Sequence, residues 1–319
     1  MSPSGSLADR RLDEVPFVVI DVETTGLDPD ADRIVEVCAV VVDPGAPPRV
    51  ALDTLVDPEG PLRATGIHGI TEADLAGAPR IAALADAIRA VAAGRVVAGH
   101  NIRFDLSFLD AALGRVGAGL RPPCLCTMRL PALIGRAANW PLWWACQRNG
   151  VPFEGHPHSA RGDARATAGL LAVQLAALRD AGVRTFADVA ERGRALRVPY
   201  TFLGSLGRAL LPPVSAALPA LRPRADGEDG VRAVDPERRY HDAVARALAA
   251  LRLTPEAHAA VEAARGRLGI DAATARRVHG RILANAERRF AEDGRIDAEE
   301  AAHLDALRRC LAGLDLRSG

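Results

Sequence analysis

The chain has 319 residues, of which 40 are basic and 40 are acidic, and it therefore carries no formal net charge at neutral pH. This length allows about two domains, and a hydrophobic share of 49% can build a sizeable core. Balanced charge is not typical of proteins that bind long nucleic-acid duplexes through a basic face, and no apolar run is long enough to span a membrane. The polar N-terminus lacks the apolar core of a signal peptide, which predicts a cytoplasmic protein. The five scattered cysteines lack zinc-finger spacing, which predicts reduced thiols.

The first chemical motif ends an expected strand. Residues 17–20 form an apolar run rich in β-branched side chains, which predicts a buried strand, and Asp21 and Glu23 end this strand. Because side chains in a strand alternate with period two, the two acids point to the same side. Two acids at the end of a buried strand are costly unless a cation compensates their charge, and carboxylate oxygens suit Mg2+ or Mn2+. Taken alone, the pair is also compatible with an ordinary solvated strand end.

The next residues predict a turn and two more strands. Thr24, Thr25 and Gly26 form a small polar turn that a substrate backbone can approach closely. Residues 33–43 and 49–56 are then expected to form a second and a third strand. The short connections favour an antiparallel meander of these three strands.

A helix, a short strand and the second motif come next in the chain. Apolar residues recur at helical spacing over 81–91, and the run 96–99 predicts a short buried strand. Asn101 is expected to cap the following helix, and Asp105 lies in the first turn of that helix. A carboxylate there also suits the helix dipole, so helix capping is the alternative explanation of Asp105 taken alone.

The third motif, HSARGDARATA, opens a helix expected from Ser159 to Leu178. Asp163 lies on this helix and His158 precedes it. Since the unperturbed pKa of histidine is about 6.5, His158 suits a proton acceptor near neutral pH. His156 does not fit the motif and is expected to be an ordinary surface residue.

In order and spacing, the segments DVETTGL, IHGIT and GHNIRFD and the His158/Asp163 pair resemble the motifs of the DEDDh 3′–5′ exonucleases. This family includes the proofreading ε subunit of bacterial DNA polymerase III. The resemblance covers residues 15–180 and implies an α/β fold, namely a ribonuclease H-like mixed sheet flanked by helices, in which strand 96–99 runs parallel to the first strand. It also implies hydrolysis of single-stranded DNA from the 3′ end with release of nucleoside 5′-monophosphates, in proofreading or DNA repair.

The resemblance further implies a site for two divalent cations, Mg2+ or Mn2+. Their ligands would be Asp21, Glu23, Asp105 and Asp163, with Asp21 bridging the metals and Asp105 acting partly through water, while His158 takes the proton of the attacking water. The implied substrate-binding groove holds the terminal nucleotide, with one leucine as a wedge at the base and one phenylalanine as a base contact. Its residues would be Val22, Thr24, Thr25, Gly26, Leu27, His68, His100, Asn101 and Phe104.

Two aromatic features nearby are expected to serve packing. Phe108 lies one helical turn after Phe104 and is expected to face the core. Trp140, Trp143 and Trp144 are close together in sequence, and their spacing is that of ordinary helix packing. We therefore expect the three indoles to fill the core of the exonuclease-like region, where the family has an apolar helix before its last motif, with stacking on nucleic acid as the alternative.

The resemblance ends near residue 180. Residues 181–236 are expected to form a short helical extension and a Pro/Gly-rich linker that tethers the next domain, with docking onto a partner as the alternative. Residues 237–316 predict a small all-α domain. Its DG-x-ID-x-EE pattern weakly resembles the tellurite-resistance TerB-like domains, which implies an interaction module for a protein partner.

The segment AEDGRIDAEE between two expected helices has some likeness to a calcium-binding loop. Arg289 and Ala291 stand where such a loop needs its first oxygen ligands, which argues against calcium. Asp297 and Glu300 are instead expected to form a capping box, with Gly294 ending the preceding helix.

Two other functions compete with DNA hydrolysis. RNA 3′-end trimming, as by ribonuclease T or oligoribonuclease relatives, would use the same five residues, although DVETTGL and IHGIT look closer to the proofreading and repair branch. A non-catalytic nucleic-acid-binding module usually loses a carboxylate, and all four acids and the histidine are present here. The expected partners are single-stranded DNA 3′ ends, with RNA as the alternative, and a protein bound by the C-terminal domain; no membrane contact is expected.

Overall fold

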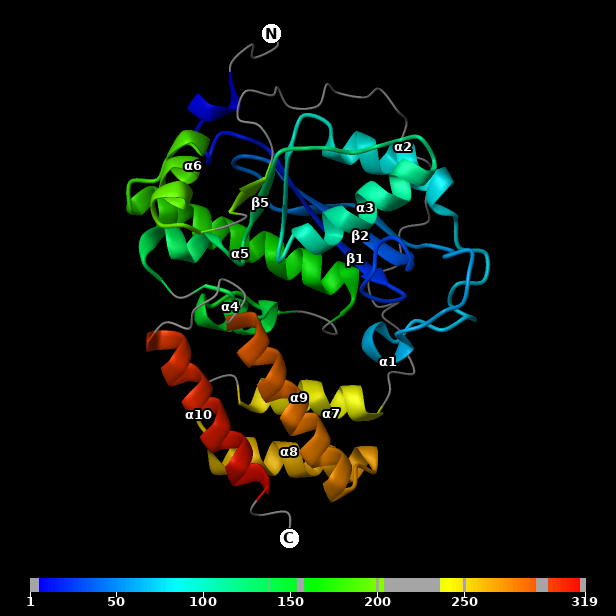
Figure 1. Cartoon of the computed structure of the whole chain (residues 1–319), viewed down its shortest axis with the longest axis vertical. Helices are drawn as coiled ribbons and strands as arrows, with labels where there is room; N and C mark the ends of the chain where they lie inside the picture. The colour runs from blue at the N-terminus through cyan, green and yellow to red at the C-terminus, as the bar shows by residue number, and fades with distance from the viewer. Residues whose placement is uncertain are drawn as a thin grey trace.

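The structure, a computed structural model, describes residues 6–136, 138–153, 158–198, 201–203, 236–248, 251–290 and 298–315. It has two regions, a sheet flanked by helices and a group of helices from the C-terminal part of the chain (Figure 1). His156, the linker residues 204–235 and the segment 291–297 lie outside the described residues, so the expectations for them stay predictions. No helix in the described ranges is long and apolar enough to cross a bilayer.

Six strands form one mixed sheet in the order β3-β2-β1-β4-β5-β6. The first three pair antiparallel, and β4 pairs parallel with β1, so the predicted meander and the predicted parallel strand are both confirmed. β5 runs parallel to β4, and β6 closes the edge in the antiparallel direction. The strands are β1 (Phe17–Thr24), β2 (Ile34–Val42), β3 (Arg49–Leu55), β4 (Val96–Gly99), β5 (Cys124–Cys126) and β6 (Phe202–Leu203).

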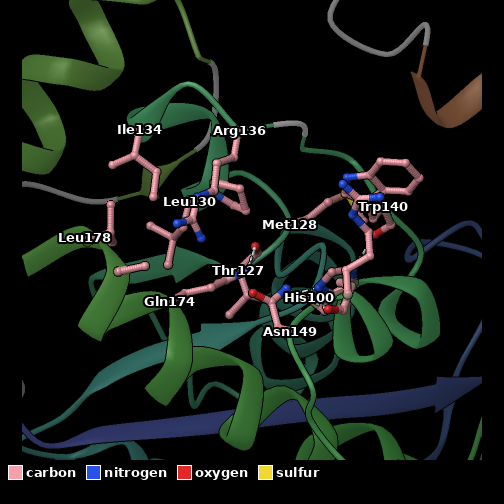
Figure 2. Close-up of a pocket in the computed structure, with 14 residues that line it drawn as sticks. His100, Thr127, Met128, Leu130, Ile134, Arg136, Trp140, Asn149, Gln174 and Leu178 are labelled. Atoms are coloured by element: carbon pink, nitrogen blue, oxygen red, sulfur yellow. Dashed lines mark hydrogen bonds between the residues drawn. The ribbon is translucent and has the colours of Figure 1, made fainter. Parts of the chain in front are cut away.

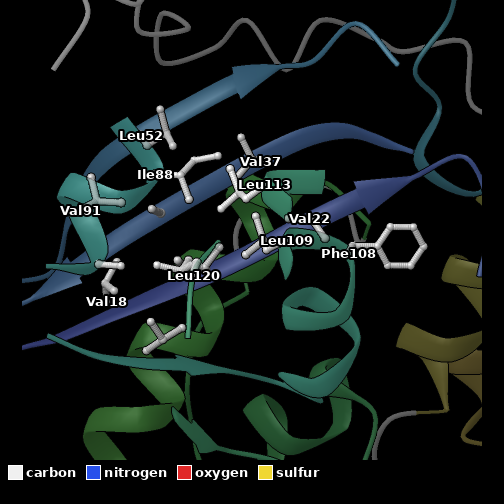
Figure 3. Packing of buried hydrophobic residues seen from close by; sticks show 14 of the residues in the cluster. Val18, Val22, Val37, Leu52, Ile88, Val91, Phe108, Leu109, Leu113 and Leu120 are labelled. Atoms are coloured by element: carbon white, nitrogen blue, oxygen red, sulfur yellow. The ribbon is translucent and has the colours of Figure 1, made fainter. Parts of the chain in front are cut away.

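Helices cover both faces of the sheet, which is why β1 and β2 are apolar along almost their whole length. The period-two alternation of β1 divides its side chains between two cores. Val18, Ile20 and Val22 pack under α2 and α3, as Figure 3 shows for Val18 and Val22, and Phe17 and Val19 pack under α5 and α6. These helices are α2 (Ile81–Ala92), α3 (Arg103–Arg115), α5 (Ala160–Asp180) and α6 (Phe186–Ala195).

Segments on both sides of the predicted exonuclease limits 15 and 180 also pack into the sheet region. Leu7 and Leu12 share a core with Phe186 of α6, whose N-terminus carries a capping box formed by Thr185 and Asp188. The helical extension expected after residue 180 is therefore present as α6. The short helices of this region are η1 (Leu7–Asp9), α1 (Thr65–His68), η2 (Leu130–Ile134) and α4 (Leu142–Arg148).

The C-terminal helices form the bundle, by which we mean α7 (Pro236–Ala247), α8 (Pro255–Leu268), α9 (Ala272–Phe290) and α10 (Ala298–Asp315). Its core includes Tyr240, whose hydroxyl lies 3.1 Å from Nε2 of His279, and Nδ1 of that histidine lies 2.8 Å from Asp315. Trp140 and Trp144 are buried, as predicted. However, they belong to the core shared with the bundle, whereas the sequence analysis assigned them to the core of the exonuclease-like region.

The five cysteines are all buried and none forms a disulfide, in agreement with the expectation of reduced thiols. Burial raises the pKa of Cys146 to about 12, so this thiol stays protonated and unreactive near neutral pH.

Candidate active site

The first two acids of the site come from the end of β1. The strand continues through Thr24, so Asp21 and Glu23 lie among its last residues, at the end of the strand as predicted. They have the same parity as Phe17 and Val19 and therefore extend the face of the sheet that α5 covers. Glu23 is buried, and Asp21 remains partly exposed to the cavity described below.

The start of α5 brings Asp163 and His158 to this face. Ser159 occupies the N-cap position, and Asp163 lies in the first turn, as predicted. The backbone N–H of His158 donates to Oδ2 of Asp163 at 3.3 Å, and His158 has a φ of 66°. A left-handed backbone is uncommon outside glycine and often marks functional sites. The backbone hydrogen bond thus fixes the position of His158 relative to the Asp163 carboxylate.

Asp105 reaches the same place from α3, on the other side of β1. Its Oδ1 accepts a hydrogen bond of 3.0 Å from the backbone N–H of Val22, the residue between the two acids of β1. The carboxyl group is buried. One acid on a helix is therefore anchored directly to the strand that carries the other two.

The site concentrates negative charge in a buried place. Burial raises the pKa of Asp21 well above its ordinary value, and Asp105, Asp163 and Glu23 raise it further by repulsion. Burial also raises the pKa of Asp105 to about 7, against the lowering effect of the Val22 hydrogen bond. Carboxylates so close together cannot all be ionised unless a cation compensates them.

The donor set fits a divalent cation. Glu23, His158 and Asp163 each offer a ligand atom, and these atoms lie within 4.8 Å of one another. The chain contains no lysine, and no arginine is among the described residues that line the surrounding cavity, so none of these residues supplies a fixed cation there. Hard carboxylate oxygens with one imidazole are typical ligands of such ions. Asp21 and Asp105 line the same cavity, and the assignment of Asp21, Glu23, Asp105 and Asp163 as metal ligands stays a prediction.

The sequence profile of a family described as exonuclease matches residues 18–171, the stretch that carries all five of these residues. This segment of the chain is therefore similar to the exonuclease family, and we call the sheet region that contains it the exonuclease domain. In curated sequences, the DNA polymerase III subunit epsilon-like protein of Rhodobacter capsulatus is 40% identical over 205 residues, which cover 60% of this chain and 29% of that protein. The PolC-type DNA polymerase III of Bacillus subtilis is 32% identical over 182 residues, covering 56% of this chain and 12% of that protein.

The chain thus spans less than a third of the length of these two relatives. Among solved structures, exonuclease X in complex with 5′ overhanging duplex DNA is similar to the exonuclease domain, with a TM-score of 0.41 and 26% identity. That similarity covers 52% of this chain and 93% of the exonuclease X chain.

Two buried acids that the sequence analysis missed hold the start of α5 in the exonuclease domain. Oε2 of Glu36, on β2, accepts a hydrogen bond of 3.1 Å from the backbone N–H of Ala160. Asp53, on β3, forms an ion pair of 3.1 Å with Arg161. The available signal was an acid inside each of two otherwise apolar strands, because such a group is costly unless it has a partner. Together they position the helical turn that carries Asp163.

A cavity of about 500 Å3, the cleft, contains the predicted catalytic residues Asp21, Glu23, Asp105, His158 and Asp163 in its lining. Most of the predicted substrate-binding residues line it as well, and these are Val22, Thr24, Gly26, Leu27, His100, Asn101 and Phe104. Their roles toward a substrate stay predictions.

Thr25 and His68 are not among the cleft-lining residues. Oγ1 of Thr25 lies 3.2 Å from Oδ1 of Asp32 and accepts from the backbone N–H of Arg33, so it shapes the turn. His68 is buried, and its ring is bonded to the carbonyl of Arg63 and the N–H of Ile70. Both side chains form hydrogen bonds within their own loops, and their roles toward a substrate stay predictions.

The turn after β1 presents Leu27 to solvent. A Cβ atom on Gly26 would collide with the carboxylate of Asp32, so the close approach of this acid requires glycine. The Asp32 carboxylate also accepts the N–H of Asp28. Held in this way, Leu27 is 82% exposed at the rim of the cleft, a suitable place for a wedge against a base.

His100 and Asn101 join β4 to α3. The His100 ring lies 3.0 Å from Oγ1 of Thr127 and 2.7 Å from the carbonyl of Trp140, so both nitrogens are occupied (Figure 2). Behind it lies a second cavity of about 170 Å3. Asn101 does not cap α3, contrary to the prediction, because it adopts a φ of 67° and Ile102 takes the N-cap position without a side-chain hydrogen bond.

The aromatic residues of α3 divide as predicted between core and cleft. Phe108 is fully buried beside Leu109 (Figure 3). Phe104 is partly exposed, lines the cleft and packs against Phe108 with ring centroids 4.9 Å apart. The buried ring therefore supports the one that faces the cleft.

Proposed function

We propose that the chain is a metal-dependent 3′–5′ exonuclease that releases nucleoside 5′-monophosphates from the 3′ ends of single-stranded DNA, in proofreading or DNA repair. The observation that carries this proposal is the cluster of Glu23, His158 and Asp163 in the cavity that Asp21 and Asp105 also line. The family match supports the reaction class. The names of the relatives, which are DNA polymerase III proteins, favour DNA over RNA.

In this proposal the four carboxylates hold two divalent cations, Mg2+ or Mn2+. When bound, the cations supply positive charge at the scissile phosphate and make a bound water more acidic. Asp21 is the candidate shared ligand, because both Asp105 and Asp163 are near enough to raise its pKa. Asp105 keeps its position relative to β1 through the Val22 N–H.

His158 is proposed to accept the proton of the attacking water. Three features support this role: its ring nitrogen lies within 4.8 Å of ligand atoms of Glu23 and Asp163, its backbone N–H is bonded to Asp163, and it lines the cleft. General-base catalysis by a positioned side chain typically contributes about 10²–10⁴-fold in rate.

The test is a gel assay with 5′-labelled single-stranded DNA and RNA of the same sequence, with Mg2+, Mn2+ or a chelator. We expect a metal-dependent ladder that shortens from the 3′ end of the DNA and is lost in His158→Ala. His156→Ala, two positions earlier and outside the motif, is the matched control and should behave like wild type. A ladder mainly on RNA would move the protein to RNA end processing, and no cleavage of either strand would contradict the proposal.

A further inference from the structure

The bundle is held against the exonuclease domain by a continuous apolar core. Trp140 and Trp144, at the start of the domain's α4 segment, share this core with Val244 and Leu307 of the bundle. The ring of His303 on α10 lies edge-on to both indoles, with centroids 4.2 and 4.6 Å apart. Because such an interface buries aromatic surface from both sides, it fixes where the bundle lies.

This placement makes the bundle one wall of the catalytic cleft. The lining of the cleft includes His241 and Ala245 of α7, Ile282 and Asn285 of α9, and Leu307 of α10, as well as the catalytic acids. In Figure 1 the bundle lies below α4 and below the sheet region to which β1 and α5 belong.

The chemistry of the bundle side differs from that of the acid side. Besides apolar groups, the bundle residues offer imidazole and amide groups, and the neighbouring Trp143 and Phe153 add two aromatic rings 5.4 Å apart. No arginine from the described residues lines either side, so the described bundle residues offer no guanidinium fork for a phosphate. Apolar, aromatic and amide groups suit nucleobases, which stack on rings and accept or donate hydrogen bonds.

Trp143 supplies a more specific indication. Its indole Nε1 is buried, and among the described residues no group accepts a hydrogen bond from it. Buried donors usually have a partner, and a base carbonyl in the cleft is a suitable one. The cleft volume of about 500 Å3 lies in the usual range of small-ligand sites, about 300–1,000 Å3, and suits the end of a strand better than a duplex.

We propose that the bundle is a base-binding wall of the active site: it contacts the bases of the last nucleotides of an unpaired 3′ end, while their phosphates face the acids. This inference rests on the proposed exonuclease function and adds to it a source of strand selection outside the exonuclease domain. Since the wall offers stacking surface and few directed groups, it favours unpaired over paired ends with little preference among bases.

Adjacent positions of α9 provide the test. Asn285 lines the cleft and Ala284 does not, although both are exposed, and neighbouring helix residues point about 100° apart. Asn285→Glu places a negative charge where the strand enters, and we expect the KM for a single-stranded oligonucleotide of ten thymidines to rise about tenfold with kcat changed less than about twofold. Ala284→Glu adds the same charge outside the cleft and should stay within about twofold of wild type. Asn285→Gln, which keeps a neutral amide, should restore a KM close to that of wild type.

A small substrate separates failure of the wall from failure of the function. Wild-type protein is also given the p-nitrophenyl ester of thymidine 5′-monophosphate, which needs the metal site and carries one base. If wild type cleaves this ester and the oligonucleotide but both glutamate variants have the same KM, the bundle is not a binding wall and the exonuclease function stands. If wild type cleaves neither substrate with Mg2+ or Mn2+, the function is wrong and the inference built on it is overturned as well.

Discussion

The two sides of the cleft are positioned by different kinds of interaction. On the sheet side, strand alternation places Asp21 and Glu23, and a backbone hydrogen bond from Val22 places Asp105. On the bundle side, the packing of Trp140 and Trp144 against distant helices decides which residues reach the cleft. Short motifs encode the first kind of placement, whereas the second depends on contacts between segments far apart in sequence.

The two sides also differ in their electrostatics. Burial raises the pKa of the acids on the sheet side, so that side favours bound protons or a bound cation. Burial and the nearby Arg148 lower the pKa of His303 to about 4 on the bundle side, so that side favours the neutral imidazole. A rise in pH should therefore change the contributions of the two sides to the free energy of unfolding in opposite directions.

Removal of the central acid should have the largest effect. Asp21→Asn takes away the carboxylate that faces the acids of both other elements, and we expect the kcat for single-stranded DNA to fall by about 10³-fold. Without metal, the variant should melt at the same or a higher temperature than wild type, because it relieves repulsion among buried carboxylates. Activity in Mg2+ and thermal unfolding in chelator give the two readouts. Activity equal to that of wild type would contradict the proposed metal site.

A smaller effect is expected from the anchor of α5. Glu36→Gln weakens the charge-assisted hydrogen bond to the N–H of Ala160, and should cost about 1 kcal/mol of stability and about tenfold in kcat. Asp53→Asn breaks the ion pair with Arg161 and is the matched variant, because Asp53 holds the same start of α5 from the neighbouring strand. Chemical denaturation and initial rates measure both quantities. Wild-type kcat in a destabilised Glu36→Gln would show that this acid supports only the fold.

The sheet side could be predicted from the sequence because its determinants are local. Apolar runs predicted the strands, short connections predicted the antiparallel pairs, and the family resemblance implied that β4 is parallel to β1. The acids of the three motifs line one cleft. The cap at Asn101 failed because a turn with positive φ shifts the start of α3 by one residue. Glu36 was missed because a single acid in a strand gives no indication of the helix end it will meet.

The bundle side could not be predicted because no local pattern defines it. The spacing of the tryptophans correctly predicted burial of Trp140 and Trp144 but not their packing against the bundle, and it was wrong for Trp143, which is partly buried and lines the cleft. Helical periodicity in the last third of the chain predicted a helical domain but not the face by which it packs. At short range, the motifs also could not show that the side chains of His68 and Thr25 form hydrogen bonds within their own loops. Their predicted roles toward a substrate stay predictions.

The acid side should lose stability as pH rises when no metal is present. The folded-state pKa of Asp105, about 7, lies above its unfolded value of about 3.9, so between these values the folded protein binds more protons than the unfolded chain. Stability should therefore decline from about pH 4 to pH 7, by at most about 4 kcal/mol for a shift of this size. Asp105→Asn should reduce this slope, and so should millimolar Mg2+. Unfolding free energies in chelator across this range measure the slope, and a flat profile for wild type would contradict the prediction.

The bundle side should show the opposite dependence, with a smaller amplitude. The folded-state pKa of His303, about 4, lies below its unfolded value of about 6.5, so the unfolded chain binds more protons between these values and stability falls as pH is lowered through them. We expect a contribution of about 1 kcal/mol, less than the full shift would give, because the ring borders the solvent-filled cleft. His303→Phe keeps an aromatic ring against Trp140 and Trp144 and removes the titration. The comparison is made in the Asp105→Asn background, where the acid side contributes less to the pH dependence. There, His303→Phe should flatten the profile of unfolding free energy between pH 4 and 6.5. An unchanged slope would mean that His303 is not the group that couples the stability of the bundle to pH.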